Sequence, residues 1–335
     1  MKIGLIGVGR IGQLHGELLT YHVPEAEIKT VAEINLAEVK RWAKQLNILN
    51  LTTDYTDILN DTEIEAVLIC SSTDTHAQMI IEAAKAGKHI FCEKPIDFNI
   101  EKIKQALNST EAAGVKLQIG FNRRFDHNFK KVREVVESGQ VGDVHIVKIT
   151  SRDPAPPPIE YVKVSGGMFL DMTIHDFDMA RYLSVSEVEE VYAQGAVLVD
   201  PAIGQVGDVD TAIISLKFKN GAMGVIDNSR QAVYGYDQRV EVFGSQGNVE
   251  VKNDFPDSAR LSTARGVFSA KPQYFFLERY KMSYVEELKA FVDAVANDKE
   301  PAVTGNDGLQ PVLIGVAALK SLEARRPVKI EEILK

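Results

Sequence analysis

The chain has 335 residues, 45% of them hydrophobic, and a formal net charge of −9 from 47 acidic and 38 basic side chains. This length allows two domains, each with its own core. The acidic balance argues against a nucleic-acid partner, which needs concentrated basic charge, and no apolar run approaches the ~20 residues of a membrane span. The first residues resemble a strand and not a signal peptide, so we expect a cytoplasmic protein without a membrane partner.

A glycine-rich turn occupies the first twelve residues. The apolar run Lys2–Ile6 predicts a buried strand, Gly7-Val8-Gly9-Arg10-Ile11-Gly12 follows it, and a helical pattern begins at Ile11. In such a turn Gly7 permits the bend, Gly9 lets the backbone approach a pyrophosphate, and Gly12 allows close packing of helix on strand. The anion would lie at the helix N-terminus, so we predict a dinucleotide site here.

Glu33 ends a second predicted strand, Ile28–Ala32, roughly 20 residues after the last glycine. In a dinucleotide-binding domain a carboxylate at this place bonds the ribose 2′-hydroxyl and repels a 2′-phosphate. The next basic residues, Lys40 and Arg41, fit the exposed face of the following helix. The sequence therefore favours NAD over NADP as the cofactor.

Strand and helix patterns alternate through the rest of residues 1–121, which we predict to be a Rossmann domain with a parallel sheet. We expect helices over 36–46, 75–86 and 100–113, and strands over 66–70, 89–92 and 115–120. The loop Ser71-Ser72-Thr73-Asp74 follows one strand at its carboxyl end, where ligands bind in open α/β sheets. Cys70 and Cys92 end apolar runs and predict buried, reduced thiols, with a catalytic Cys92 thiolate as the alternative.

Residues 122–335 are predicted to form an α+β domain for substrate binding and oligomerisation, with a large, mostly antiparallel sheet. The expected strands cover 144–149, 188–199, 211–218, 223–228, 238–243 and 248–251, with turns at 219–221 and 245–247. One helix is expected over 170–183 and two more over 283–296 and 308–324, the last of which could pack back on the first domain. The outward face of this sheet would need a partner, so we expect a homo-oligomer, a tetramer or a dimer.

Two segments carry candidate catalytic groups. Lys94 stands in Glu93-Lys94-Pro95 at the end of a predicted strand, where Pro95 disfavours helical backbone and an ammonium could polarise a carbonyl or alkoxide. Asp171 and His175 are four residues apart on a predicted helix, so the carboxylate can support the imidazole as a general base. The alternatives are a surface lysine and a capping aspartate beside a structural histidine. We predict no metal site, because no cysteine pair or histidine cluster completes a zinc ligand set.

Taken together, four motifs resemble the glucose-fructose oxidoreductase/inositol dehydrogenase/rhizopine-catabolism (Gfo/Idh/MocA) family over essentially the whole chain. They are Gly7 to Gly12, Glu93-Lys94-Pro95, Gly120 to Asp126, and Asp171-x-x-x-His175-Asp176-x-Asp178. Arg152-Asp153-Pro154 and Tyr234-Gly235-Tyr236-Asp237 are similar to the inositol dehydrogenases of that family.

The resemblance implies an NAD-dependent dehydrogenase that oxidises myo-inositol, or a closely related inositol, to its 2-keto derivative. His175 would be the base oriented by Asp171, and Lys94 would hold the reacting oxygen. Substrate contacts are implied for Lys94, Arg123, Asp153, Asp171, His175, Asp178 and Tyr236. Cofactor contacts are expected from Gly7, Gly9, Arg10, Ile11, Gly12, Glu33, Ser71, Ser72, Thr73, His76, Glu93, Lys94, Pro95 and Asn122.

Two other functions stay open at this point. The same chemistry could act on scyllo-inositol, a hexopyranose or another polyol, since Asp153 stands where some members of the family have Asn. A non-catalytic dinucleotide sensor could also use this fold, because fold does not fix function. The sensor need not retain Lys94, Asp171 and His175, and this chain has all three.

Overall fold

The computed structural model describes residues 1–334 and separates into two compact units. Unit 1 comprises Met1–Asn122 and Met282–Val312, and unit 2 comprises Arg123–Lys281 and Leu313–Lys335. The domain boundary expected from the sequence lies at nearly the same residue, but that prediction assigned all of 122–335 to the second domain. In the structure the segment Met282–Val312 returns to unit 1, and the division falls inside the helix α12 (Gly305–Ala324), near Pro311.

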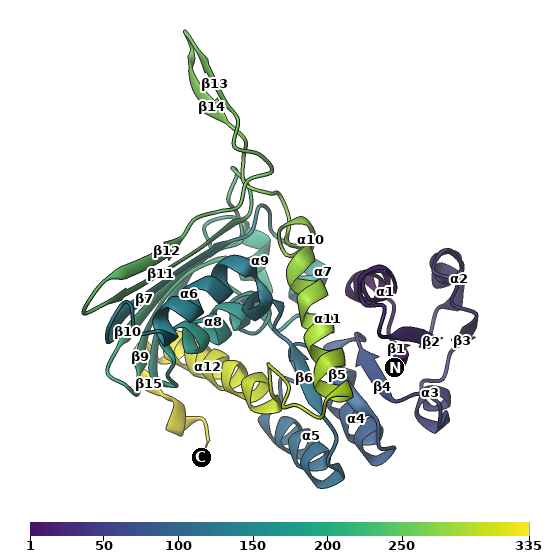
Figure 1. Ribbon diagram of the computed structural model, residues 1–335. Coiled ribbons are helices and arrows are strands. Elements are labelled where there is room, and N and C mark those ends of the chain that lie inside the picture. The colour runs from purple at the N-terminus through teal and green to yellow at the C-terminus, as the bar shows by residue number, and fades with distance from the viewer. Residues whose placement is uncertain (335) are drawn as a thin grey trace. The chain divides into compact units, whose positions relative to one another are not determined.

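Within residues 1–334, unit 1 contains a six-stranded parallel sheet in the order β3-β2-β1-β4-β5-β6 (Figure 1). This is the strand order of the dinucleotide-binding Rossmann fold. Its strands are β1 (Lys2–Ile6), β2 (Glu27–Ala32), β3 (Asn50–Thr52), β4 (Ala66–Ile69), β5 (His89–Glu93) and β6 (Leu117–Gly120). Its helices are α1 (Arg10–His22), α2 (Leu36–Gln45), α3 (Thr56–Asn60), α4 (Thr73–Lys85), α5 (Ile100–Ala113) and α11 (Lys281–Ala296).

Local sequence signals explain these elements. Every residue of β4 is buried, as a central parallel strand requires. Helix α5 matches its predicted bounds because both ends are capped: the Asn99 side chain accepts bonds from the amides of Glu101 and Lys102, and Gly114 ends the helix at φ +65°. The three-residue strand β3 was not predicted, since so short a run has no readable alternation.

Unit 2 is built on a seven-stranded sheet in the order β12-β11-β7-β10-β9-β8-β15, within the part of the chain described. All its neighbours are antiparallel except β10 and β7, so the prediction of a mostly antiparallel sheet is confirmed. Its strands are β7 (Val144–Arg152), β8 (Val188–Ala196), β9 (Thr211–Phe218), β10 (Met223–Ser229), β11 (Asp237–Gly244), β12 (Asn248–Val251) and β15 (Val328–Lys329). The helical segments are η1 (Asn122–Phe125), α6 (His127–Glu137), α7 (Ile159–Val162), η2 (Met168–Met172), α8 (Ile174–Ser184), α9 (Pro201–Gln205), α10 (Phe276–Arg279) and η3 (Ile330–Glu332).

One face of this larger sheet is buried and the other is open. Strand β9 alternates between buried and exposed residues along its length, the period-2 pattern of a half-covered strand. Helix α8 contacts β7 on the buried face, and α6 contacts β11 and β12. The turns predicted at 219–221 and 245–247 join β9 to β10 and β11 to β12, as expected for hairpins.

Two features of unit 2 differ from the sequence prediction. The helix expected over 170–183 is a π-helical turn, η2, followed by α8, because the Thr173 amide bonds the Met168 carbonyl five residues earlier. A two-stranded hairpin, β13 (Arg260–Thr263) and β14 (Gly266–Ser269), extends away from the sheet (Figure 1). It was missed because all eight of its strand residues are exposed and show no alternation of burial.

No helix among residues 1–334 combines the length and the apolar character needed to cross a membrane.

The glycine turn gives a direct test of this packing. A Cβ on Gly12 would lie 2.1 Å from the Gly7 carbonyl oxygen, whereas a Cβ on Gly9 would meet no atom within 4 Å. We expect Gly12→Ala to lower the free energy of unfolding by about 2–4 kcal/mol, because backbone has to move. Gly9→Ala should cost less than about 1 kcal/mol. Urea denaturation followed by circular dichroism measures both, and equal losses would contradict the packing role of Gly12.

Candidate active site

In unit 1 the predicted cofactor residues follow the carboxyl ends of neighbouring strands. Ile6 of β1 is in register with Ala32 of β2 and with Ile69 of β4. Ile69 is in register with Cys92 of β5, and Cys92 with Ile119 of β6. Five predicted cofactor residues come one to three positions after this line: Gly7, Glu33, Ser71, Glu93 and Asn122. Parallel pairing therefore gathers five distant segments at the ligand-binding edge of the sheet.

The glycine turn has the geometry of a phosphate loop. Gly7 adopts φ +85°, and a Cβ there would lie 2.6 Å from the Ser71 backbone. Gly9 is the N-cap of α1, in extended conformation, with open space beside its Cα. The positive end of the α1 dipole and its unpaired amides therefore face open space beside Gly9.

Glu33 is held against this turn. Its Oε2 accepts a 2.7 Å hydrogen bond from the Val8 amide, and its Oε1 accepts a 3.2 Å bond from the Asn35 amide. The carboxylate thus lies beside the glycine turn, although 25 residues separate Glu33 from Val8. The position of a carboxylate here was expected from the sequence, whereas the hydrogen bond from the Val8 amide was not.

His76 ties two of the loops together. Its Nδ1 lies 2.8 Å from the Pro95 carbonyl oxygen, and its Nε2 lies 3.0 Å from the Ser71 carbonyl oxygen. The ring is buried, and burial lowers its pKa. The Lys94–Pro95 peptide beside it is cis. The loop predicted at 71–74 is shorter than expected, since Ser72 caps α4 and Thr73 is already helical.

Glu93 and Asn122 belong to the same edge of the sheet, since Glu93 ends β5 and Asn122 follows β6. Glu93 Oε1 lies 2.6 Å from His15 Nε2, and its Oε2 accepts a 3.3 Å bond from the Lys94 amide. Asn122 is buried, and its Nδ2 has no hydrogen-bond partner within residues 1–334. An orphaned buried amide at a ligand-binding edge can donate to a ligand oxygen.

Unit 2 gathers its predicted substrate residues in the same way. Arg152 of β7 is in register with Ser229 of β10 and with Asp237 of β11. The residues just beyond this line are Asp153, Arg230 and Tyr236. Arg152 also donates a 3.2 Å bond to the Tyr234 hydroxyl. Strand pairing therefore joins the two motifs, Arg152-Asp153-Pro154 and Tyr234 to Asp237, that lie about 80 residues apart in the sequence.

Asp171 and His175 are the two residues of the segment 171–180 that are not buried. The glycines before them, Gly166 and Gly167, adopt φ +88° and +73° and bring the chain into the π-helical turn. Asp171 Oδ1 accepts a 2.8 Å bond from the Tyr161 hydroxyl, and its Oδ2 accepts a 3.2 Å bond from Arg230 Nη1. Tyr161 and Arg230 were not identified from the sequence, because each contacts Asp171 only through the fold.

Asp153 has an unusual charge environment. Burial is the main cause that raises its pKa to about 6, and nearby Asp171 adds to the shift while Arg230 opposes it. Arg230 Nη1 lies 3.7 Å from Asp153 Oδ2. About 25% of the Asp153 side chain is exposed, so this carboxyl group can be reached by a ligand. The pair of carboxylates around one guanidinium is the type of group that a polyol can bond through several hydroxyls.

Two arginine–aspartate pairs hold further side chains of unit 2, one of them buried and the other partly buried. Arg123 Nη1 donates a 2.5 Å bond to Asp176, and Arg123 Nη2 reaches the Tyr236 hydroxyl at 3.4 Å. Arg124 binds Asp178 through Nε at 2.9 Å and through Nη2 at 2.6 Å. Arg123 and Asp178 therefore have partners within unit 2, and their substrate contacts stay predictions. The sequence did not identify Asp176 as a partner of Arg123, because the two residues lie 53 positions apart and meet only through the fold.

The cysteine prediction is resolved by burial. Cys70 and Cys92 are free and buried, as expected, and burial raises the pKa of both thiols well above the ordinary value. Burial and a raised pKa both disfavour a thiolate at neutral pH, which argues against the alternative of a catalytic Cys92.

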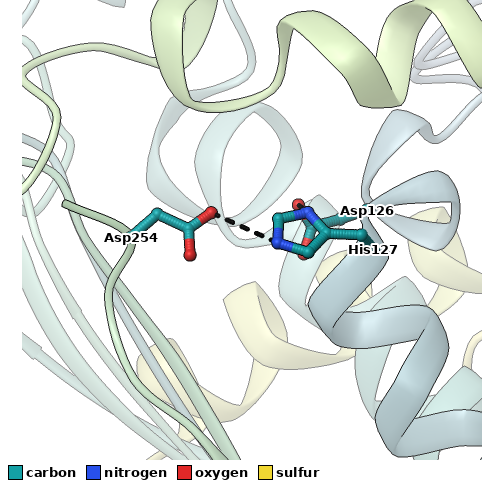
Figure 2. Close-up of side chains that lie close together, drawn as sticks. All are labelled: Asp126, His127 and Asp254. Carbon is teal, nitrogen blue, oxygen red and sulfur yellow. Dashed lines mark ion pairs between the residues drawn. The ribbon is translucent and has the colours of Figure 1, made fainter. Parts of the chain in front are cut away.

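One group of side chains in residues 1–334 has ligand atoms close enough to hold a metal: Asp126, His127 and Asp254 (Figure 2). His127 is exposed, and its Nε2 lies 3.8 Å from Asp254 Oδ2. Arg279 Nη1 already lies 2.5 Å from Asp126 and 3.1 Å from Asp254. This guanidinium supplies the positive charge between the two carboxylates. The geometry therefore indicates an arginine that holds Asp126 and Asp254 together, and we propose no metal site here.

The comparisons with known proteins match both units. Residues 1–121 match the model of the oxidoreductase family with an NAD-binding Rossmann fold, and residues 129–250 match the GFO/IDH/MocA C-terminal domain. The chain belongs to the Gfo/Idh/MocA oxidoreductase family. This family member is accordingly an NAD-dependent dehydrogenase.

Its relatives and structural neighbours cover the full length. It is 51% identical to myo-inositol 2-dehydrogenase of Thermotoga maritima over 100% of both chains. It is 42% identical to inositol 2-dehydrogenase of Rhizobium meliloti over 98% of this chain and 99% of that one. The crystal structure of scyllo-inositol dehydrogenase from Lactobacillus casei with NAD(H) and scyllo-inositol superposes with a TM-score of 0.93, at 29% identity and 99% coverage of both chains.

The residues of unit 1 fit NAD. Gly9 leaves open space at the N-terminus of α1 for a pyrophosphate, and Glu33 lies beside the turn as a ribose-binding carboxylate would. Asn122 has an orphaned amide group at the same edge. Of the predicted catalytic residues, Lys94 belongs to unit 1, whereas Asp171 and His175 belong to unit 2.

Removal of Arg230 tests the charge pairing in unit 2. This residue is buried between Asp153 and Asp171, so Arg230→Ala leaves two carboxylates without their shared cation. We expect the free energy of unfolding to fall by about 3–5 kcal/mol at pH 7 and by less below pH 5, where Asp153 is protonated. Lys148→Ala, which removes an exposed pair with Glu241, should cost less than about 1 kcal/mol. Urea titrations at both pH values would contradict this role if the two variants behaved alike.

Proposed function

We propose that this protein is an inositol 2-dehydrogenase that oxidises myo-inositol, or a closely related inositol, to its 2-keto derivative with NAD. The observation that carries the proposal is the pair Asp171 and His175, the accessible residues in an otherwise buried segment. A carboxylate and an imidazole on one accessible side suit the removal of a hydroxyl proton. Full-length relatives named for inositol 2-dehydrogenation support the substrate class.

The cofactor residues divide into three groups by what they would hold. Gly7, Gly9 and Gly12, with Arg10 and Ile11, form the turn for the pyrophosphate, and Glu33 accepts from a ribose hydroxyl. Ser71, Ser72 and Thr73 follow β4 at the same edge, while His76 positions their loop through Ser71. Glu93, Lys94, Pro95 and Asn122 would lie near the nicotinamide.

Each catalytic residue has a separate task in the proposed reaction. Bound NAD supplies the hydride acceptor. His175 removes the proton of the reacting hydroxyl, and Asp171 stabilises the imidazolium that forms. Lys94 donates to the same oxygen and stabilises its developing negative charge. Tyr161 and Arg230 fix the Asp171 carboxylate, so its orientation does not depend on the substrate.

The remaining hydroxyls of the inositol ring would bond the edge of the unit 2 sheet. Asp153 is a carboxylate above a pH of about 6 and can accept from a hydroxyl there. Tyr236, Arg123 and Asp178 complete the proposed pocket. Isomers of inositol differ only in which face of the ring each hydroxyl occupies, so these few side chains would select among them.

A second candidate is oxidation of scyllo-inositol, which the structural neighbour from L. casei binds together with NAD(H). Asp153 favours no single isomer. Hexopyranoses are a further alternative substrate class. The non-catalytic sensor considered from the sequence is set aside, because the chain belongs to an oxidoreductase family. The cytoplasmic location expected from the sequence stays a prediction.

A substrate panel combined with three variants tests the catalytic assignment. Wild-type enzyme should reduce NAD with myo-inositol or scyllo-inositol in preference to hexopyranoses. His175→Ala should lower kcat by ~10²–10⁴, since general-base catalysis is typically worth that much, and Lys94→Ala should be at least as damaging. Asp171→Asn should lower kcat less. The dissociation constant for NAD, measured by fluorescence titration, should change little in each variant.

Lys102→Ala serves as a control, because its exposed ammonium lies 3.7 Å from Asp97 outside the proposed machinery. The assignment would be wrong if His175→Ala and Lys94→Ala both kept near-wild-type turnover. Loss of NAD binding in parallel with kcat would instead show that the variants had damaged the fold.

We further propose that the protein works as a homo-oligomer, most simply a tetramer. The open face of the larger sheet presents Ile213, Met223 and Phe243, which are 46%, 57% and 44% exposed. Apolar residues on one sheet face favour a covered face. The hairpin β13–β14 also exposes Leu261, Val267 and Phe268.

Light scattering at micromolar concentration tests this assembly. Wild-type protein should have the mass of a tetramer or a dimer. Met223→Lys combined with Phe243→Glu should dissociate it, because charges would enter the covered face. Tyr21→Lys, an exposed position in unit 1, should leave the mass unchanged. A monomeric wild-type mass would sink the proposal.

A further inference from the structure

Unit 1 encloses a group of buried polar and titratable side chains, most of which have no task in the proposed reaction. We call it the Glu287 cluster, and it draws on five elements that are distant in the sequence. Its members are His15 on α1, Cys70 just after β4, Cys92 and Glu93 on β5, Gln118 on β6 and Glu287 on α11. All six are buried.

Glu93 is the member that touches the proposed active site. One carboxylate oxygen lies 2.6 Å from His15 Nε2, and the other accepts the Lys94 amide at 3.3 Å. A Cβ on Gly120 would lie 3.0 Å from the Glu93 carboxyl carbon, so the glycine at this position leaves the room that the carboxyl group occupies over β6. Both oxygens of the Glu93 carboxyl group are therefore held by named partners, His15 and the Lys94 amide.

Glu287 faces the same region without any donor. Its side chain is fully buried, and neither carboxyl oxygen has a hydrogen-bond partner within residues 1–334. Helix α11 is anchored there, because Gln118 Nε2 donates a 2.9 Å bond to the Glu287 carbonyl oxygen. Tyr284, one turn earlier, packs edge-on against His15 with ring centres 5.5 Å apart.

Electrostatics decides which of the two carboxyl groups holds a proton. An ionised carboxylate that is buried without donors is costly, and a second negative charge nearby adds to the cost. Burial first, and the charge of Glu93 second, raise the pKa of Glu287 well above its usual value. Burial and the charge of Glu93 likewise raise the pKa of Cys70 and of Cys92, so the two thiols add no charge at neutral pH. No lysine or arginine contributes to the shift at Glu287.

We propose that Glu287 is a positioning residue that carries a proton at neutral pH, so that Glu93 alone holds negative charge and fixes the backbone of Lys94. The role of Lys94 in this inference rests on the proposed function. Loss of the Glu287 proton would place two like charges in one buried compartment. The carboxylate of Glu93 would then be displaced from His15 or from the Lys94 amide. The backbone from which the Lys94 side chain extends would no longer be held in place.

The proton at Glu287 links folding to pH. In the unfolded chain Glu287 loses its proton near its ordinary pKa, whereas the folded protein retains it to higher pH. Over that window the native state binds more protons than the unfolded state, so stability falls as pH rises. Glu287→Gln keeps the size and the neutral charge of the protonated side chain, and it removes this dependence.

Thermal unfolding of the apoprotein from pH 5 to pH 9 tests the proton directly. The midpoint of Glu287→Gln should rise relative to that of wild type as pH rises, by on the order of 5 °C across the range. Glu286→Gln is the matched control, since the neighbouring Glu286 is exposed and pairs with Lys289 on the same helix. A constant difference between Glu287→Gln and wild type at all pH values would overturn the proposal.

The pH profile of turnover tests the positioning role. In Glu287→Gln the kcat at neutral pH should stay within about threefold of wild type, and any alkaline loss of kcat should move to higher pH, with KM for NAD unchanged. If kcat fell at the same alkaline pH in Glu287→Gln as in wild type, the link between Glu287 and Lys94 would be refuted. If Glu287→Gln does not fold, Glu287→Leu gives the same neutral state without buried amide donors. Absence of any polyol oxidation by wild type would reject the proposed function, while the unfolding series would still report on the Glu287 proton.

Discussion

Strand register is the constraint on which both halves of the candidate site depend. In unit 1, five parallel strands end on a common line, and the residues that follow them come from segments between Gly7 and Asn122. In unit 2, Arg152 is in register with both Ser229 and Asp237, which places Asp153, Arg230 and Tyr236 at one edge. A slip of one residue would turn each of these strands over and disperse the group.

Buried charge fixes the side chains that this register brings together. Arg123 holds Asp176, Arg124 holds Asp178, and Arg230 holds Asp171, while His15 holds Glu93. Such pairs contribute little net stability, because the cost of removing both charges from water is comparable to their attraction. Their value here is orientation: each pair sets the direction of a group that must meet a ligand in one geometry.

Short irregular segments aim the functional side chains. Gly166 and Gly167 adopt positive φ angles, and the Asp208 carboxylate accepts the Met168 amide where the helical segment begins. The π-helical turn then adds one residue to the helical repeat before α8, and such turns are frequent at functional sites. Asp171 and His175 emerge from this segment as its accessible residues, while their neighbours supply the core.

The sequence alone determined the Rossmann domain, the mostly antiparallel second sheet and the nucleotide turn. These follow from short-range signals: a buried run before Gly7, capped helices such as Ile100–Ala113, and alternating strands such as Thr211–Phe218. Glu33, Lys94, Asp171 and His175 could be proposed as site residues because their spacing from such signals is short or fixed. The tertiary structure alone decided what each of these groups touches. Arg230, Tyr161 and Glu287 lie 59, 10 and 194 residues from the groups they would orient, and no local pattern encodes contacts created by strand pairing and helix packing.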